Sequence, residues 1–202
     1  MKKLMIAAAF VCAVVVSHAA SFNWTCSGTL KDGYGKAADP SYTPVALGSK
    51  TIYLLASEAA TSATDMTAQS ALIAGLRSGS IKASDLASMA VATATTGAGG
   101  TVSGTIAFTD DVAVGATAWY YAVVVDGDYA FVSTNGKTTA LEDPKAGSLS
   151  VGVGSSTVLK DSTTTGAVSA TGWYNVAAVP EPTSGLLLLL GVAGLALRRR
   201  RA

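Results

Sequence analysis

The chain has 202 residues, of which 50% are hydrophobic and 13% charged, and its formal net charge is +1. Residues 20–180 hold 8 basic and 12 acidic side chains, a net charge of −4, which excludes the basic face that nucleic-acid binding requires. This part of the chain fits one domain and is long enough to bury a core.

The first residues have the layout of a secretory signal peptide. Lys2 and Lys3 precede an apolar stretch over residues 4–16, and the small residues Ser17 and Ala19 follow it. The stretch is shorter than the roughly 20 residues that span a bilayer as a helix. We therefore expect a signal peptide at residues 1–19, which signal peptidase cleaves after Ala19.

Cleavage after Ala19 limits the chemistry that the exported chain can perform. His18, the one histidine of the chain, leaves with the signal peptide, and so does Cys12, so that Cys26 is the single remaining cysteine. The exported chain therefore has no internal disulfide, no histidine-based catalytic triad and no zinc site with histidine ligands.

Two strands are predicted before residue 60. Phe22, Trp24 and Cys26 alternate along one side of the first strand. Residues 50–57 read as a second, buried strand, which follows a segment rich in glycine and proline.

The hydrophobic period becomes helical between residues 65 and 90. Asp65 is placed to cap a helix over residues 65–77, and Gly79 follows as its stop signal. A second short helix is predicted over residues 83–90. The positions expected to face the core are Leu72, Ile73, Leu76, Leu86, Met89 and Ala90.

A β-hairpin is the clearest local prediction. Asp126 and Gly127 form a favoured two-residue turn, which would place Val124 opposite Tyr129. Both faces of the hairpin are apolar, so we expect it to be central in its sheet and covered on both sides. One face is predicted to carry Trp119, Tyr121, Val123 and Val125, and the other Tyr120, Ala122, Val124, Tyr129 and Phe131.

Further strands are predicted at residues 105–109, around the alternating Leu149, Val151 and Val153, and close to Trp173. Many short strands separated by turns favour a mainly β fold. We expect a β-sandwich-like domain over residues 20–178, with one or two short helices around residues 65–90.

Chemical motifs are weak in this domain, and we expect no catalytic residue, cofactor or metal. Asp126 and Asp128 begin like a calcium loop, but a hairpin turn explains them better. Cys26 is expected to be a buried, inert strand residue. Two acid pairs would resemble a glycosidase site only if the fold brought them together: Asp110 with Asp111, and Glu142 with Asp143.

Aromatic residues offer an alternative, because aromatic rings stack on the C–H faces of sugars. Trp119, Tyr120, Trp173 and Tyr174 are the candidates for such stacking if their rings reach the surface. Packing in the core is the competing interpretation of the same residues.

The tail at residues 179–202 has three parts. Pro180, Glu181 and Pro182 form an extended corner, an apolar segment follows over residues 185–197, and the arginines come last. As a helix the apolar segment is about 20 Å long, which is short for a hydrocarbon core of about 30 Å. We therefore expect a short membrane-inserting helix, with its basic cluster in the cytoplasm: Arg198, Arg199, Arg200 and Arg201.

This tail resembles the PEP-CTERM sorting signal. The resemblance covers about the last 24 residues and includes the Pro-Glu-Pro motif, the leucine-rich span and the arginines in the order that the signal requires. It implies recognition and cleavage by an exosortase-type membrane enzyme, in a Gram-negative-type bacterium. A plain single-pass tail anchor is the alternative.

The expected function follows from both ends of the chain. The resemblance implies a transient inner-membrane anchor, and then a structural or adhesive, non-enzymatic role at the cell surface or in an extracellular biofilm or polysaccharide matrix. A carbohydrate-binding module of the same matrix is the alternative, and a carboxylate-based hydrolase is a third.

Overall fold

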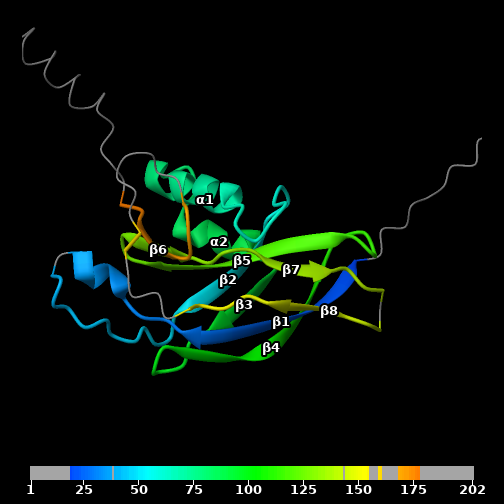
Figure 1. The fold of residues 1–202 in the computed structure, drawn as a ribbon, viewed down its shortest axis with the longest axis horizontal. Helices are drawn as coiled ribbons and strands as arrows, with labels where there is room; N and C mark the ends of the chain where they lie inside the picture. Colours follow the sequence, from blue (N-terminus) through cyan, green and yellow to red (C-terminus); the bar gives the residue numbers. More distant parts are fainter. Residues whose placement is uncertain (1–18, 38, 143, 155–158, 161–167, 178–202) are drawn as a thin grey trace, which may run out of the picture.

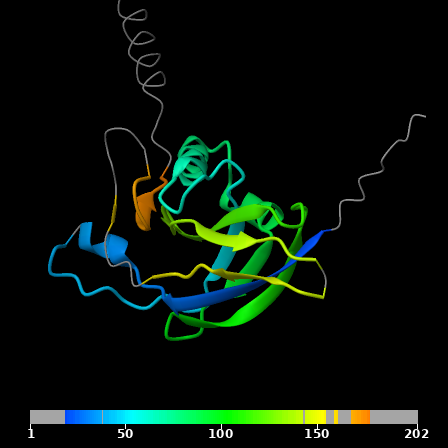
Figure 2. The same cartoon turned by 45° about the vertical axis from the view of Figure 1, so that its right-hand side comes forward.

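A computed structural model describes residues 19–37, 39–142, 144–154, 159–160 and 168–177. These residues form two β-sheets that face each other and two short helices that cover the outer side of the larger sheet (Figures 1 and 2). The prediction of a mainly β fold with short helices is confirmed.

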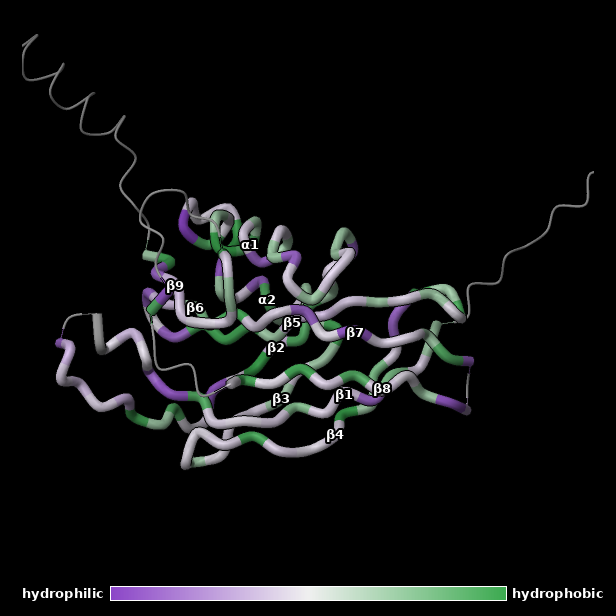
Figure 3. The backbone as a smooth tube through the Cα atoms, in the orientation of Figure 1, coloured by the Kyte–Doolittle hydropathy of each residue, from purple (hydrophilic) through white to green (hydrophobic). Residues whose placement is uncertain are grey.

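The smaller sheet has the strand order β4-β1-β8. Its strands are β1 (Ala20–Thr29), β4 (Thr101–Asp110) and β8 (Gly147–Ser150). The alternation predicted for β1 is confirmed, because Phe22, Trp24 and Cys26 are all buried. In Figure 3 the hydrophobic positions of β1 are separated by more polar ones, as expected for a strand with one buried face.

The opposite face of the smaller sheet is polar but carries no charge. Thr25 and Ser27 of β1 lie beside Thr105 and Ser103 of β4 in the ladder, and all four are exposed. Serine and threonine side chains therefore form part of the solvent-exposed face of the smaller sheet.

The larger sheet has the order β3-β2-β5-β6-β9, and β7 also pairs with β5. Its strands are β2 (Thr51–Ala56), β3 (Ala92–Thr95), β5 (Thr117–Asp126), β6 (Tyr129–Val132), β7 (Gly136–Thr139) and β9 (Gly172–Asn175).

One hydrophobic core lies between the two sheets. The smaller sheet contributes Phe22 and Trp24, and the larger sheet contributes Tyr120, Phe131 and Trp173. Each of these five side chains is fully buried. Burying large aromatic side chains stabilises such a core by about 1.5–3 kcal/mol each.

A second core lies between the larger sheet and the helices. The helices are α1 (Thr67–Ser78) and α2 (Leu86–Met89), the latter preceded by the 3-10 turn η2 (Ala83–Asp85). The sheet contributes Tyr121, Val123 and Tyr174, among others. The prediction that the hairpin is covered on both faces is therefore confirmed.

The register of that hairpin differs from the prediction. Val124 lies opposite Phe131, and Asp126 opposite Tyr129, so the two turn residues are Gly127 and Asp128. Gly127 has φ +57°, and it occupies the first central position of the turn, which is where a type II′ turn requires glycine. The pairing moves by two residues, an even number, so every side chain stays on its predicted face.

The first helix agrees closely with its prediction. Leu72, Ile73 and Leu76 are buried, and Gly79 ends the helix with φ +72°. The prediction that Asp65 caps the helix is wrong by one position, because Met66 is the N-cap residue and makes no side-chain cap hydrogen bond. Asp65 instead accepts hydrogen bonds from the backbone N–H and the hydroxyl of Thr67, at 3.2 and 2.7 Å.

In the second helix Leu86 is fully buried, as predicted, but Met89 is 43% exposed. The prediction that Met89 faces the core is wrong. The helix has a single turn, and Ala90, which follows it, is already extended with ψ 134°. A helical face cannot continue through that change.

No helix in the described part of the chain is both long and apolar enough to cross a bilayer. The membrane-inserting helix predicted for the tail lies outside the described residues.

Candidate functional site

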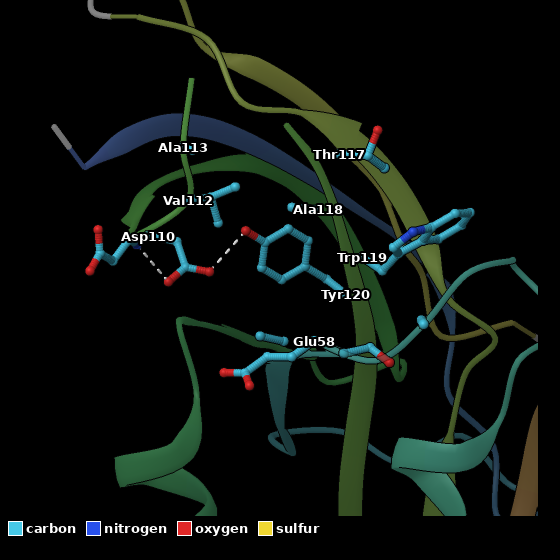
Figure 4. Close-up of a pocket in the computed structure, with 12 residues that line it drawn as sticks. Glu58, Asp110, Val112, Ala113, Thr117, Ala118, Trp119 and Tyr120 are labelled. Atoms are coloured by element: carbon cyan, nitrogen blue, oxygen red, sulfur yellow. Dashed lines mark hydrogen bonds between the residues drawn. The ribbon is translucent and has the colours of Figure 1, made fainter. Parts of the chain in front are cut away.

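A cavity of about 400 Å³ lies at one end of the sandwich. Three segments meet there: the end of β2 with the residues after it, the end of β4 with the loop after it, and the start of β5 (Figure 4). The lining residues are Ala56, Ser57, Glu58, Ala60, Asp110, Asp111, Val112, Ala113, Thr117, Ala118, Trp119 and Tyr120.

Three carboxylates line this cavity, and one of them is held in place by hydrogen bonds. The Tyr120 hydroxyl donates to Asp110 Oδ2 at 2.9 Å, and the Asp111 backbone N–H donates to Asp110 Oδ1 at 2.9 Å (Figure 4). Burial, the hydrogen bond to Asp110 and its negative charge together raise the pKa of Tyr120 above its usual range. The phenol therefore stays protonated and acts as a fixed donor to Asp110. Glu58 and Asp111 are exposed.

A serine hydroxyl in the cavity wall has no partner within the protein. Ser57 is 2% exposed, and its Oγ makes no hydrogen bond, whereas its backbone N–H donates to the Trp119 carbonyl at 2.8 Å. A buried hydroxyl without a partner costs about 1–3 kcal/mol.

The four predicted sugar-stacking residues divide into two groups. Tyr120, Trp173 and Tyr174 are buried to 1% exposure or less, so their rings belong to the cores and have no free face for a sugar. Stacking is thus wrong for these three. Trp119 is half-buried and lines the cavity, and the Lys137 ammonium lies 5.8 Å from the centre of its ring.

The fold places the two predicted acid pairs at the same end of the molecule. Ser21 of β1 pairs with Thr109 on one side and with Leu141 on the other. Two strand spacings, about 10 Å, therefore separate the backbones that lead into the pairs. Asp110 and Asp111 line the cavity and Glu142 does not, while Asp143 lies outside the described residues.

The remaining candidates have structural roles. Asp126 accepts hydrogen bonds from the Tyr34 hydroxyl at 2.6 Å and from Lys50 Nζ at 2.7 Å. It thereby ties the 3-10 turn η1 (Gly33–Ala37) to the hairpin. Cys26 is buried, and desolvation outweighs a hydrogen bond with the Val153 backbone and raises the pKa of its thiol to about 11.

Within the described residues, no group of three or more His, Cys, Asp or Glu side chains could hold a metal ion. A second hollow of about 420 Å³ is lined by Gly28, Asn135, Thr171 and other small or polar residues, without a charged side chain.

Ser57 and Glu58 are the cavity residues that sequence reasoning missed. They follow a buried strand directly, and the end of a strand is a common position for site residues. Nothing in the sequence relates them to Trp119 or Asp110. Their proximity to Trp119 depends on the pairing of β2 with β5, and their proximity to Asp110 of β4 depends on how the two sheets face each other.

Hydrogen bonds connect residues 172–176, which lie just before the tail, to the rest of the domain. Strand β9 pairs with Tyr129–Val132 of β6. The Asn175 carbonyl accepts a hydrogen bond from Arg77 Nε at 2.7 Å, and the Val176 N–H donates to the Asp128 carbonyl at 2.7 Å. At the other end, Ala19 is exposed and Ala20 is the buried first residue of β1.

The sites predicted in the tail lie outside the described residues. They are Pro180, Glu181, Pro182, Arg198, Arg199, Arg200 and Arg201.

Comparison with protein-family models finds the PEP-CTERM protein-sorting motif at residues 178–201. This match confirms the resemblance of the tail, one residue away from its predicted bounds. The motif supports export and sorting through a C-terminal signal, and it implies processing by an exosortase-type enzyme. Neither the curated proteins nor the solved structures give a match to the chain.

Proposed function

We propose that this chain, which ends in the PEP-CTERM protein-sorting motif, is a non-enzymatic structural or adhesive protein of the cell surface or the extracellular matrix. Signal peptidase releases its N-terminus after Ala19. The tail then holds the domain briefly at the inner membrane of a Gram-negative-type cell, until an exosortase-type enzyme cleaves it.

The motif at residues 178–201 is the observation that carries this proposal. The position of the last strand supports it, because β9 ends at Asn175, before the motif begins. A cut within the motif therefore removes no residue of β9 and leaves both cores complete. A domain that keeps its fold after cleavage suits a durable role outside the cell.

Mass spectrometry of the exported protein tests this proposal. We expect a mature chain that begins at Ala20 and lacks the arginines at positions 198–201. Replacing Pro180, Glu181 and Pro182 together by alanine should keep the uncleaved chain in the membrane fraction. Recovery of an exported chain with its arginines intact, or unchanged release of the triple variant, contradicts the proposal.

A second candidate function is binding of carbohydrate in the same matrix. The observation that favours it is the cavity that Trp119 lines together with the carboxylate residues Glu58, Asp110 and Asp111. Polysaccharide pull-down with the full chain and with Trp119→Ala tests it. Equal retention of both proteins, or retention of neither, contradicts it.

A carboxylate-based hydrolase is the weakest of the three candidates. It requires two carboxyl groups about 5–10 Å apart across a bound sugar. A hydrolysis assay on soluble polysaccharides, with Asp110→Asn as the inactive control, would have to show turnover for this candidate to replace the other two.

A further inference from the structure

We propose that two copies of this chain associate through β4, by antiparallel pairing of the β4 strand of one copy with the β4 strand of the other. The contact would join the two smaller sheets edge to edge into one continuous sheet. The inference concerns assembly, and it goes beyond the proposed function without resting on it.

Strand β4 lies at the edge of its sheet. It pairs with β1 over ten residues, Thr101–Asp110, and no other described strand pairs with it. It runs along the lower margin of the domain in Figures 1 and 2. The other strands at the ends of the two sheets, β8, β3 and β9, have four residues each. Among the described strands, β4 therefore offers the longest edge.

The hydrogen-bond pattern shows which backbone groups of β4 point away from β1. Opposite residues in an antiparallel ladder alternate between hydrogen-bonded and non-hydrogen-bonded pairs. The Leu30 N–H donates to the Gly100 carbonyl at 2.9 Å, next to the pair that Thr29 forms with Thr101. Even-numbered residues of β4 therefore bond to β1, and odd-numbered residues direct their N–H and C=O outward. The outward carbonyl of Thr101 accordingly accepts from the Gly97 N–H, at 2.8 Å.

The next outward groups along β4 have no partner in the described part of the chain, and they belong to four exposed residues: Ser103, Thr105, Ala107 and Thr109. A row of unpaired N–H and C=O groups is a template for a further strand. Natural edge strands commonly block such pairing with a charge, a proline or a bulge. Residues 101–109 contain no charged residue and no proline, and the ladder with β1 is free of bulges, even at Gly104 with its φ of +149°. The edge is therefore left open to a further strand.

The face of β4 that meets the core is incompletely covered. Val102 and Ile106 pack against the core between the sheets but are only half-buried, and Gly104 between them is exposed. A second β4 strand beside them would bring its own valine and isoleucine to this margin and remove apolar surface from water. On the opposite face, uncharged side chains would meet, so two identical strands do not repel each other.

A single register pairs all of these outward groups between two copies. It places Ser103 opposite Thr109 and Thr105 opposite Ala107, each as a hydrogen-bonded pair. Ile106 of one copy then lies opposite Ile106 of the other, in a non-hydrogen-bonded pair, where side chains approach most closely. A two-fold axis passes through this isoleucine pair, so the same surface is used by both copies and assembly ends at the dimer.

Disulfide cross-linking of the full chain, purified in detergent micelles, tests this register. Cα atoms in a non-hydrogen-bonded pair are about 4.5 Å apart, which a disulfide can bridge. We expect Ile106→Cys to give a covalent dimer under mild oxidation, in about tenfold higher yield than Val102→Cys. Val102 is the matched control, because it is a half-buried aliphatic residue on the same face of β4. In the proposed register it lies opposite Asp110, so the two copies of residue 102 are about 27 Å apart. The parent chain, whose thiols are Cys12 and Cys26, gives the background.

Proline substitution tests the backbone hydrogen bonds. Thr105→Pro removes an N–H that points away from β1, so it leaves the ladder with β1 complete. The control is Thr93→Pro, an exposed residue of the edge strand β3, whose N–H points away from β2 by the same count from the bond between the Thr96 N–H and the Lys50 carbonyl. In the Ile106→Cys background, we expect Thr105→Pro to reduce the covalent dimer by about tenfold and Thr93→Pro to leave it unchanged. Circular dichroism establishes that each variant is folded.

Each outcome decides for or against the β4 pairing. Background levels of dimer from Ile106→Cys, equal yields from Ile106→Cys and Val102→Cys, or a folded Thr105→Pro variant that still cross-links overturns it. Equal yields from both cysteine variants would point to association through the tail within the micelle. The tail is the same in every variant, and neither export nor cleavage is measured, so failure of the proposed function leaves this result unchanged.

Discussion

Replacing Trp173 by alanine should destabilise the domain more than the same replacement of Trp119, which also belongs to the larger sheet. The side chain is fully buried between the sheets, and its ring packs edge-on against Tyr34 and Phe131, at centroid distances of 5.0 and 5.7 Å. Its indole N–H donates to the Lys31 carbonyl at 2.7 Å. Removing a buried tryptophan costs about 3–5 kcal/mol, and the lost hydrogen bond adds about 1 kcal/mol.

The sum, about 4–6 kcal/mol, is comparable with the 5–15 kcal/mol that keeps a typical domain folded. At about 2–4 °C per kcal/mol for a chain of this size, the Tm should fall by about 8–24 °C. Thermal unfolding followed by circular dichroism of the purified full chain measures it. Trp119→Ala is the matched control, since its half-buried ring should cost only about 1 kcal/mol. If the two variants melt within about 3 °C of each other, β9 does not close the core as described.

Three further predictions concern the β5–β6 turn, the close contact between Gly28 and Val153, and the thiol of Cys26. Burial opposes ionisation of Asp126, but its hydrogen bonds and the charge of Lys50 prevail and keep the pKa of this carboxyl below its usual range. The stabilisation that ionised Asp126 gives the folded state is thus complete above about pH 4 and is lost as the pH falls through its folded-state pKa. Asp126→Asn should lower the unfolding free energy by up to about 1 kcal/mol at pH 7 and flatten its dependence on acid pH, as measured by urea titrations. An unaltered pH profile of stability would contradict this role of Asp126. Gly28→Ala should prevent folding, because a Cβ there would overlap the Val153 carbonyl oxygen and φ is +129°; a native circular dichroism spectrum would contradict this. Since burial raises the pKa of Cys26 to about 11, a thiol reagent at pH 8 should label it only on unfolding in urea, and immediate labelling of the native protein would show that it is accessible.

The elements that sequence reasoning located well are those with a strong local signal. Helix α1 has three apolar residues at helical spacing and a glycine stop, and β1 has strict alternation, so short-range chemistry was sufficient for both. The faces of the β5–β6 hairpin were also correct. Its register was not, because the sequence holds two favoured turn pairs that share Gly127. The prediction takes Asp126 and Gly127 as the turn, whereas the structure uses Gly127 and Asp128.

The candidate site could not be predicted in the same way. Trp119 and Asp110 are candidates by residue type, but Ser57 and Glu58 lie near Trp119 only because β2 pairs with β5. They share a cavity with Asp110 only because the two sheets face each other, since Asp110 belongs to β4. Of the aromatic candidates, Trp119 is half-buried and the other three are buried. Their burial depends on which face of the larger sheet packs against the smaller sheet and which against the helices. Tyr120 and Tyr121 are neighbours in β5, yet they belong to different cores. A local sequence pattern does not show which core each face of a strand will join, because that depends on contacts between residues far apart in the sequence.

The boundaries of the domain relate the fold to the sorting signal. Cleavage after Ala19 would leave Ala20, the buried first residue of β1, within the mature chain. At the other end, Val176 still donates a hydrogen bond to the hairpin turn, and the sorting motif begins at residue 178. Each predicted cut therefore falls just outside residues that the two cores require. Since neither cut would remove a described strand, we expect cleavage at both ends to leave the two sheets and both cores of the described residues intact.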